Sequence, residues 1–279
     1  GVLCVPGYAG EGPSDDAFIE AASRIGYPVM IKAAAGGGGR GMRQVDDPAA
    51  LTKALARARS EAQHAFGSDE VILEKALQGP RHVEVQIMAD EQGHVIHLGE
   101  RDCSVQRRHQ KVIEEAPCPA MTDKLRSAMG KTAVTAAKSI GYRGAGTVEF
   151  LLDEGGDFFF LEMNTRLQVE HPVTEMITGL DLVAMQIDIA QGLPLTLTQA
   201  DVQFSGHAIE ARLYAEDPSR GFLPCTGTVA LWQPGRAEHV RIDAGIDEAI
   251  SRANASDKGL SGSIWTRDVA RGQELAARL

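Results

Sequence analysis

Several features that define common protein classes are missing from this chain of 279 residues. Its four cysteines are widely spaced, which argues against a disulfide framework and against a cysteine metal site. We therefore expect reduced thiols and a cytoplasmic location. No apolar run approaches the ~18 residues that a membrane-spanning helix needs, so we expect no contact with a membrane.

Positive charge is also scarce. The chain has 28 lysines and arginines against 38 aspartates and glutamates, which gives a net charge of -10. Proteins that bind nucleic acids need a broad basic surface, and we therefore expect no nucleic-acid partner. With 43% hydrophobic and 24% charged residues, the composition is that of an ordinary globular protein.

Hydrophobic periodicity predicts an α+β fold without internal repeats. Helices are expected over residues 14–24, 48–66, 122–140 and 180–191. Strands are expected over residues 29–33, 71–76, 82–89, 144–152 and 158–163, with further strands after residue 205. The pattern of residues along the sequence changes near residues 77 and 205, so the expected domains are residues 1–76, 77–204 and 205–279.

A basic run begins at Arg107, within this acidic chain. Five donor-bearing side chains, Arg-Arg-His-Gln-Lys, stand in a row, and the pair Glu114 and Glu115 follows after two apolar residues. Because like charges repel, such a run indicates a small anionic partner that offsets the repulsion. A solvated loop or helix face is the alternative.

Lys32 lies within an apolar strand and is followed by four consecutive glycines, Gly36, Gly37, Gly38 and Gly39. A buried, unpaired ammonium is costly, so Lys32 needs an anionic partner. Glycine amides can approach phosphate oxygens without interference from a Cβ atom. The pattern predicts a phosphate site, although the lysine precedes the glycines and so does not form a Walker A loop. A flexible linker is the alternative.

Two carboxylates are expected to oppose each other in the hairpin over residues 144–163. If this hairpin closes through a four-residue turn, Glu149 faces Glu162 and Leu151 faces Phe160. Opposed carboxylates destabilise an antiparallel pair unless a cation lies between them. The side chain two residues beyond Glu162 is an asparagine that points to the same face, and together they form the all-oxygen set that Mg²⁺ prefers. Two solvent-facing acids are the alternative.

Three polar side chains follow this hairpin at alternating positions, Arg166, Gln168 and Glu170. In an extended segment they lie on one side. An arginine can hold a small oxyanion through two hydrogen bonds, and a glutamate can act as a base. The segment therefore predicts an oxyanion site, with a solvated polar strand as the alternative.

These motifs together resemble the biotin carboxylase component of biotin-dependent carboxylases, within the ATP-grasp superfamily, over about residues 3–250. The resemblance rests on motifs that occur in the family order: Ile31-Lys32 with its glycine loop, Glu74-Lys75, Pro80-Arg81-His82-Val83-Glu84, Arg101-Asp102-Cys103-Ser104, the basic run, and Glu162 through Glu175. It implies an ATP-grasp fold with a small lid subdomain and a larger antiparallel-sheet subdomain, followed by a partial, β-rich C-terminal domain.

The resemblance implies a role for each matching residue. The implied ATP ligands are Lys32 and the glycine loop at the phosphates, Glu74, Lys75 and Leu77 at the adenine, His82 and Glu84 near the ribose, and His109 and Gln110 elsewhere on the nucleotide. The implied ligands of Mg²⁺ or Mn²⁺ are Glu149, Glu162 and Asn164. The implied bicarbonate site consists of Lys111, Arg166, Gln168 and Val169, with Glu170 as the base and Arg212 as the residue that stabilises the enolate of biotin.

The implied reaction is the ATP-dependent carboxylation of biotin by bicarbonate through carboxyphosphate, which is the first half-reaction of an acyl-CoA carboxylase. The implied partners are a biotin carrier domain or protein, a carboxyltransferase component and, in the full protein, further copies of the same chain in a homo-oligomer.

The sequence departs from the family pattern at both ends. Members of the family carry an N-terminal α/β domain before the lid, and we expect that domain to be missing here. Residues 252–268 do not follow the family pattern, so the C-terminal domain is expected to be incomplete. Two other functions stay open: another ATP-grasp ligase that joins a carboxylate to an amine, and a nucleotide-binding fragment without catalysis.

Overall fold

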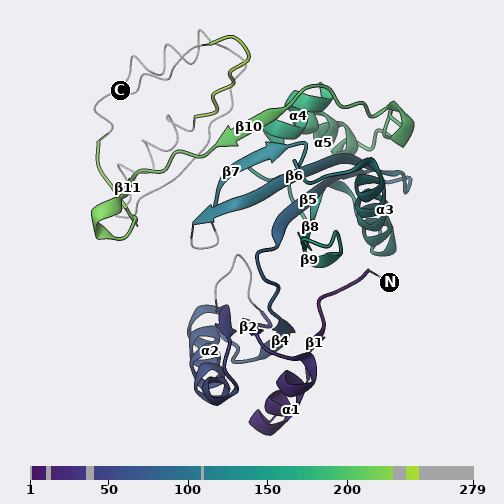
Figure 1. Cartoon of the computed structure of the whole chain (residues 1–279). Coiled ribbons are helices and arrows are strands. Elements are labelled where there is room, and N and C mark those ends of the chain that lie inside the picture. Colours follow the sequence, from purple (N-terminus) through teal and green to yellow (C-terminus); the bar gives the residue numbers. More distant parts are fainter. Residues whose placement is uncertain (1, 11–13, 36–40, 108–109, 229–236, 245–279) are drawn as a thin grey trace. The chain divides into compact units, whose positions relative to one another are not determined.

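The computed structural model describes residues 2–10, 14–35, 41–107, 110–228 and 237–244. The glycine loop and His109 therefore lie outside the described residues. Contacts divide the chain into two compact units, residues 1–211 and 212–279. The first unit contains two antiparallel sheets, one of four strands and one of six (Figure 1).

The four-stranded sheet has the strand order β1-β4-β2-β3. Its strands are β1 (Gly7–Tyr8), β2 (Val29–Ala33), β3 (Arg43–Val45) and β4 (Val71–Lys75). Its helices are α1 (Asp15–Ile25), the short 3₁₀ turn η1 (Pro48–Ala50) and α2 (Leu51–Phe66). Val29, Ile31 and Ala33 of β2 are buried, and the first two join the core with both helices. Because strand residues alternate between faces, Lys32 points away from that core.

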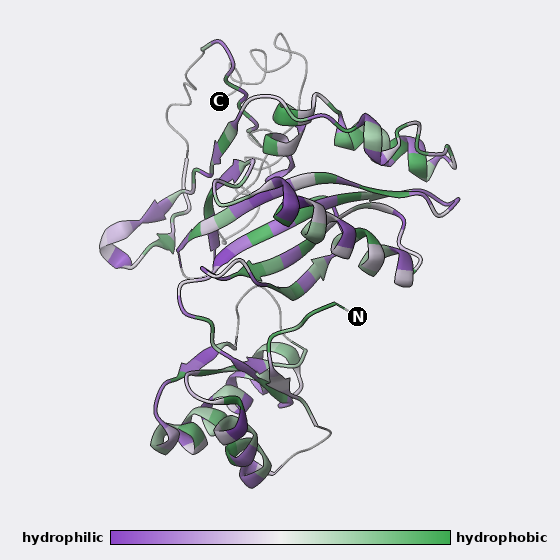
Figure 2. Cartoon of the chain, turned by 45° about the vertical axis from the view of Figure 1, so that its right-hand side comes forward, coloured by the Kyte–Doolittle hydropathy of each residue, from purple (hydrophilic) through white to green (hydrophobic). Residues whose placement is uncertain are grey.

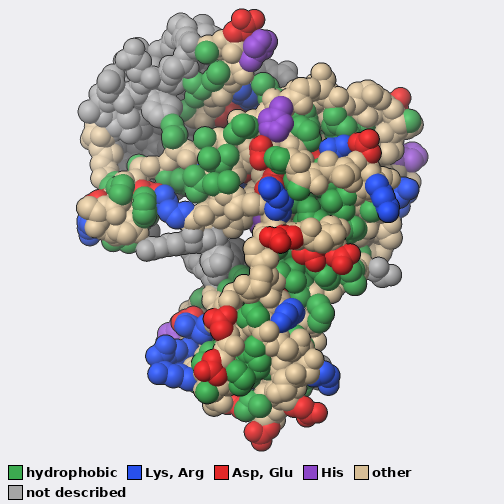
Figure 3. Space-filling view, in the orientation of Figure 1, with side chains coloured by type: hydrophobic (Ala, Val, Ile, Leu, Met, Phe, Trp, Pro, Cys, Tyr) green, Lys and Arg blue, Asp and Glu red, His purple; other side chains and the backbone are tan. Residues whose placement is uncertain are grey.

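Local signals in the sequence place the ends of these helices. The hydroxyl of Ser14 accepts a hydrogen bond from the Ala17 amide at the start of α1. Gly67 ends α2 in the left-handed conformation, with φ at 74°. The outer face of α2 exposes Lys53 and Arg57, and Figure 3 shows lysine and arginine side chains gathered over this helix. The helices expected in this part of the sequence are confirmed.

The six-stranded sheet has the order β10-β7-β6-β5-β8-β9. Its strands are β5 (Arg81–Ala89), β6 (Val95–Arg107), β7 (Gln110–Ala116), β8 (Gly144–Leu152), β9 (Phe158–Asn164) and β10 (Ala208–Ala211). The helices that accompany it are α3 (Asp123–Ser139), α4 (His171–Thr178), α5 (Leu182–Ala190) and the 3₁₀ turn η2 (Gln199–Asp201).

The two faces of this sheet differ in chemistry. Val83, Val85 and Ile87 of β5 form a core with Met129 and other residues of α3. The residues between them in β5 point to the opposite face, where α4 and α5 contribute to two further clusters. Figure 2 shows in purple that several residues of the strands in this sheet are hydrophilic. Buried polar side chains therefore collect on the face that α3 does not cover.

The basic run is described at its two ends, which lie in paired strands. It includes the end of β6 at Arg107 and the start of β7 at Gln110, and Gln106 pairs with Lys111 across the two strands. At Lys111 the alternative of a solvated loop or helix face is wrong, because this residue belongs to a strand of the sheet and its side chain is only 13% exposed.

A close contact between α3 and β6 gives a prediction for stability. A Cβ atom added at Gly130 would lie 2.6 Å from ring atoms of His97. We expect Gly130→Ala to lower the free energy of unfolding by about 1–3 kcal/mol, because overpacking outweighs the higher helix propensity of alanine. Urea unfolding measures this change. In a His97→Ala background the same substitution is expected to stabilise by up to about 1 kcal/mol, and equal destabilisation in both backgrounds contradicts the steric account.

The four cysteines divide into two buried and two exposed thiols. Cys103 and Cys118 are buried, whereas Cys4 and Cys225 are exposed. Burial and the nearby charge of Asp102 raise the pKa of Cys118 to about 12, so this thiol stays protonated at neutral pH. Because the thiolate is the reactive form, we expect a maleimide to label two cysteines in the folded protein and four after denaturation. Mass spectrometry counts the labels, and rapid labelling of Cys118 in the folded protein contradicts the expectation.

The described part of the second unit contains a small hairpin. Its elements are β11 (Glu216–Asp217), the 3₁₀ turn η3 (Pro218–Arg220) and β12 (Leu223–Pro224). Strand β10, which was expected to start the C-terminal domain, instead pairs with β7 in the first unit. The domain bounds derived from the sequence stay a prediction. Within the described residues, no helix combines the length and the apolarity that crossing a membrane requires.

Candidate active site

Strand register brings glutamates together on the face opposite α3. Glu84 of β5 pairs with Glu149 of β8, and Glu149 pairs in turn with Glu162 of β9. Glu84 and Glu149 are buried. Carboxylates directly opposed across strands repel each other, so this arrangement needs compensating positive charge. The predicted opposition of Glu149 and Glu162 is confirmed.

The rest of the predicted hairpin register is wrong. Phe160 pairs with Phe150, not with Leu151. The loop between β8 and β9 has five residues rather than four, and a bulge follows between the Glu149 and Phe150 pairs. The extra loop residue shifts the register by one, and the bulge shifts it back. The two irregularities cancel at Glu149, which is why the expected pair of carboxylates is still formed.

Lys111 supplies positive charge to this cluster. Its ammonium donates to Glu84 at 2.5 Å, to Glu149 at 2.9 Å and to Glu170 at 2.7 Å. Burial alone lowers the pKa of Lys111, but the charges of Glu84 and the other carboxylates outweigh burial and hold this pKa well above its usual value. Lys111 is therefore a permanent cation with a carboxylate partner for each of its three N–H groups.

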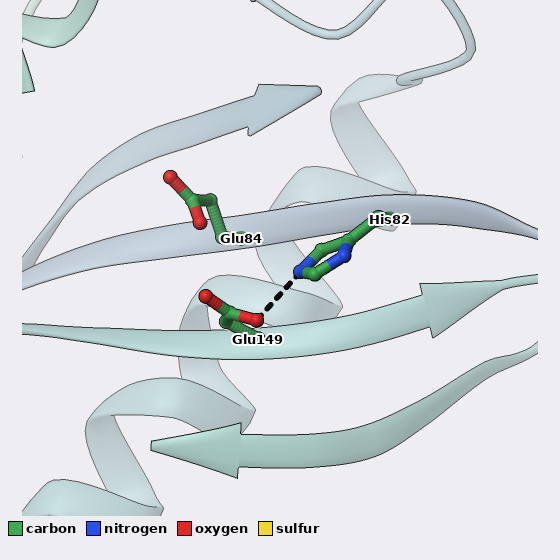
Figure 4. Close-up of side chains that lie close together, drawn as sticks. All are labelled: His82, Glu84 and Glu149. Carbon is green, nitrogen blue, oxygen red and sulfur yellow. Dashed lines mark hydrogen bonds and ion pairs between the residues drawn. The ribbon is translucent and has the colours of Figure 1, made fainter. Parts of the chain in front are cut away.

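Glu149 takes part in four hydrogen bonds within the site. One of its oxygens lies 2.6 Å from His82 Nε2, and the other accepts from Asn164 at 2.9 Å and Gln168 at 3.0 Å, as well as from Lys111. Figure 4 shows His82 and Glu149 turned toward each other, with Glu84 beside them. Burial opposes ionisation, but the hydrogen bond with His82 and the charges around Glu149 lower its pKa to about 2. Glu149 is therefore ionised at any physiological pH.

The tautomer of His82 follows from its neighbours. The amide nitrogen of Gln106 donates to the Cys103 carbonyl at 2.8 Å, which fixes the orientation of that amide. The same nitrogen lies 2.8 Å from His82 Nδ1, so Nδ1 accepts this bond. Nε2 then carries the hydrogen atom and donates a hydrogen bond to Glu149.

The segment after β9 is not extended, so the predicted alternation of Arg166, Gln168 and Glu170 is wrong. The chain turns before α4, and Glu170 occupies the N-cap position of that helix. The physical reason is Pro172, because the fixed φ of proline suits the first turn of a helix. Gln168 and Glu170 are nevertheless both buried in the cluster, whereas Arg166 is exposed.

Arg166 and Val169 lie at the exposed rim of this segment. The Arg166 guanidinium donates to Asn164 Oδ1 and to the Leu167 carbonyl, both at 3.4 Å. These bonds are long, so much of the hydrogen-bonding capacity of Arg166 is left for a ligand. Val169 is 43% exposed.

Arg101 is a residue of this cluster that sequence reasoning did not assign to the site. Its side chain is fully buried. It donates to five side chains from four other elements or loops: Glu84, Gln86, Thr147, Gln168 and Thr174. The available signals were the motif Arg101-Asp102-Cys103-Ser104, on which the resemblance partly rests, and the position of an arginine between two acids, Glu100 and Asp102.

The residues present fit a divalent cation. The ligand atoms of His82, Glu84 and Glu149 lie within 4.8 Å of one another, but with Nε2 of His82 protonated and Nδ1 accepting from Gln106 the imidazole has no lone pair for a metal. The predicted ligand set differs, because it combines Glu149 with Glu162 and Asn164. Within the described part of the chain, Glu162 has no hydrogen-bond partner, so its carboxylate is available to a cation. Carboxylate and amide oxygens are the ligands that Mg²⁺ prefers.

The predicted nucleotide residues of the first sheet are placed as follows. Lys32 forms an ion pair with Glu74 across β2 and β4. The Lys75 ammonium donates to the carbonyls of Gly26 and Tyr27, at 3.0 and 2.8 Å. The remaining predicted residues are Leu77, half-buried after β4, Gln110, exposed at the start of β7, and Arg212, the first residue of the second unit.

Comparisons with known proteins show which family this chain resembles. A family model described as the ATP-binding domain of the carbamoyl-phosphate synthase L chain matches residues 1–198, and one described as the biotin carboxylase C-terminal domain matches residues 210–272. Biotin carboxylase 1, a chloroplastic protein of Populus trichocarpa, is 56% identical over 244 residues, which are 88% of this chain and 46% of that protein. The chain thus spans about half the length of the curated relatives that it matches.

Solved structures give the same result. A biotin carboxylase β,γ-ATP complex from Campylobacter jejuni has a TM-score of 0.82 and 50% identity, covering 86% of this chain and 54% of that chain. The biotin carboxylase domain dimer of the 2-oxoglutarate carboxylase from Hydrogenobacter thermophilus, with MgADP, ADP and bicarbonate, has a TM-score of 0.81 and 49% identity, covering 85% and 52%. The predicted α+β, ATP-grasp fold is confirmed. The chain therefore belongs to the biotin carboxylase family.

Proposed function

We propose that this chain carboxylates biotin with bicarbonate at the expense of ATP, through carboxyphosphate. The observation that carries the proposal is Lys111, which is only 13% exposed and binds Glu84, Glu149 and Glu170 next to the amide of Gln168. A fixed cation and an amide donor suit a small oxyanion, and a carboxylate at the same place can remove its proton.

The contacts of Lys111 connect proton removal to anion binding. In the described structure all three of its N–H groups go to carboxylates. When Glu170 accepts the proton of bicarbonate, it becomes neutral and holds its N–H donor less strongly. That donor can then turn to the newly formed carbonate, together with Arg166, Gln168 and the backbone at Val169. Deprotonation thus strengthens the binding of the nucleophile that it creates.

The reaction then follows as a phosphoryl transfer. A carbonate oxygen forms a bond to the γ-phosphorus of ATP, the bond from that phosphorus to the ADP oxygen breaks, and carboxyphosphate results. Carboxyphosphate breaks down to CO₂ and phosphate, the phosphate takes the N1 proton of biotin, and N1 bonds to CO₂. Positioning and charge compensation account for most catalysis of this kind. We assign Arg212 to the biotin enolate.

The nucleotide sites follow the assignments made from the sequence. Lys32, the glycine loop, Glu74, Lys75, Leu77, His82, Glu84, His109 and Gln110 are proposed for ATP, and Glu149, Glu162 and Asn164 for Mg²⁺ or Mn²⁺. The cation supplies charge that neutralises the ATP phosphates. The Campylobacter and Hydrogenobacter relatives were solved with nucleotides, and the latter also with magnesium and bicarbonate, which supports this choice of ligands.

The proposed partners are a biotin carrier domain or protein and a carboxyltransferase component, because the biotin must be delivered and its carboxyl group passed on, here to an acyl-CoA. A homo-oligomer is proposed because the Hydrogenobacter domain forms a dimer. The cytoplasmic location stays a prediction, and the Populus relative is chloroplastic.

The test is ADP release by the protein at its natural length, with Mg-ATP and with bicarbonate and free biotin varied separately. The proposal predicts turnover that needs bicarbonate and rises with biotin. ADP release that needs an amine instead supports a carboxylate–amine ligase. Calorimetric binding of Mg-ATP without any bicarbonate-dependent turnover supports a nucleotide-binding protein without catalysis.

A further inference from the structure

Arg101 uses its whole hydrogen-bonding capacity inside the protein. A guanidinium has five N–H donors. Nε donates to Glu84 at 2.5 Å, and Nη1 donates to Gln86 at 2.8 Å and to Thr174 at 2.9 Å. Nη2 donates to Thr147 and Gln168, at 3.3 and 3.2 Å. Each donor therefore has its own acceptor.

The distribution of these acceptors is informative. Only Glu84 carries a charge, so one bond is enough to neutralise the buried guanidinium. The other four acceptors are neutral, and a planar guanidinium fixes their directions relative to one another. Replacing a buried ion pair by apolar side chains of similar volume often leaves stability unchanged or raises it. Stability alone therefore does not explain a buried arginine of this kind. The four hydrogen bonds to neutral acceptors therefore indicate that Arg101 positions its neighbours.

We propose that Arg101 is a positioning residue that aligns Gln168 and Glu170 for bicarbonate. This inference rests on the function proposed above. The Gln168 carbonyl accepts from Arg101 at 3.2 Å while its amide nitrogen donates to Glu149 at 3.0 Å. The amide is thus held at both ends and cannot flip, so Gln168 always presents its donor toward Glu149.

The second connection runs through α4. Thr174 lies four residues after Glu170, and residues four apart share one face of a helix. The bond from Arg101 to Thr174 therefore anchors the first turn of α4, which starts directly after Glu170. Glu84 completes the arrangement, since one of its oxygens accepts from Arg101 and the other from Lys111. Arg101 thus sets the positions of the base Glu170, of the Gln168 amide and of Glu84, which also binds the Lys111 ammonium.

Thr174→Val is the appropriate variant. Replacing Arg101 itself leaves Glu84 with a buried, partly unpaired charge, and the protein can fail to fold. Valine keeps the shape of threonine and removes one acceptor of the guanidinium, whereas Thr174→Ser keeps the hydroxyl. The matched control is Thr178→Val on the same helix, because the Thr178 hydroxyl donates to the Thr174 carbonyl and accepts from the Leu180 amide, without contact to the arginine.

The measurement is steady-state ADP release with bicarbonate and ATP varied in turn. We expect Thr174→Val to raise the KM for bicarbonate about tenfold and to change the KM for ATP by less than about twofold, in line with one lost hydrogen bond to a charged group. Thr174→Ser is expected to restore the bicarbonate KM, and Thr178→Val to leave both KM values unchanged.

The outcomes separate this inference from the function on which it rests. If the unmodified protein shows bicarbonate-dependent turnover and Thr174→Val keeps its bicarbonate KM, the positioning role is wrong and the function stands. The role is also wrong if the two KM values rise equally, because that is the effect of a general loss of structure. If the unmodified protein has no bicarbonate-dependent turnover, both proposals are wrong.

Discussion

Lys111→Met is expected to lower kcat/KM for bicarbonate by about 100-fold or more. Methionine matches the length of the lysine stem but carries no charge, so it leaves Glu84, Glu149 and Glu170 facing one another without the cation that bridges them. Removing a fixed donor from a site where negative charge develops typically costs about 10²–10³ in rate. Initial rates of ADP release at varied bicarbonate measure the effect.

Lys138→Met serves as the control, because Lys138 is exposed in the last turn of α3. It is expected to keep kcat/KM within about twofold of the unmodified protein. Lys111→Arg keeps the charge but not the compact ammonium, and its kcat/KM for bicarbonate is expected to lie between those of Lys111→Met and Lys138→Met. A Lys111→Met variant as active as the Lys138→Met control contradicts the proposed role of the cation.

Glu170→Gln is expected to lower kcat for bicarbonate-dependent ADP release by about 10²–10⁴, which is the usual contribution of a general base. The amide is nearly the same size but cannot accept a proton from bicarbonate. Because Glu170 is assigned to bicarbonate and not to the nucleotide, the Kd for Mg-ATP is expected to change little. Rates and calorimetry on the same preparation measure the two quantities.

Glu154→Gln provides the matched substitution, since Glu154 is exposed in the loop between β8 and β9. It is expected to leave both kcat and the Kd for Mg-ATP unchanged. If Glu170→Gln turns over at the unmodified rate, bicarbonate loses its proton elsewhere. A large change in Mg-ATP binding assigns Glu170 to the nucleotide instead.

Local patterns in the sequence were sufficient for much of the fold. The strand over Val29–Ala33 was predicted with its observed bounds, because a run of apolar residues followed by glycines is a strong strand signal. The opposition of Glu149 and Glu162 was predicted from the hairpin pattern alone. It held only because a longer loop and a bulge compensate each other, and neither has a clear signal in side-chain alternation.

Other features of the site depend on tertiary contacts that a local pattern cannot carry. Arg101 lies between two acids in the sequence, so it has the appearance of a surface residue, and its five acceptors come from distant positions in the chain. Gln168 and Glu170 were expected to meet Arg166 through an extended strand. They reach the cluster through a turn before α4, which leaves Arg166 exposed. The motif resemblance names these residues for the site, and that assignment stays a prediction, whereas their arrangement in space required the fold.

The central claim is that this site phosphorylates bicarbonate. The most direct measurement uses bicarbonate labelled with heavy oxygen, with ATP and the full-length protein, followed by mass spectrometry of the inorganic phosphate. Because a carbonate oxygen bonds to the γ-phosphorus and stays there when carboxyphosphate breaks down, the account predicts phosphate that carries the label, formed in step with ADP. Unlabelled phosphate released together with ADP contradicts it, because water rather than bicarbonate has then attacked the phosphorus.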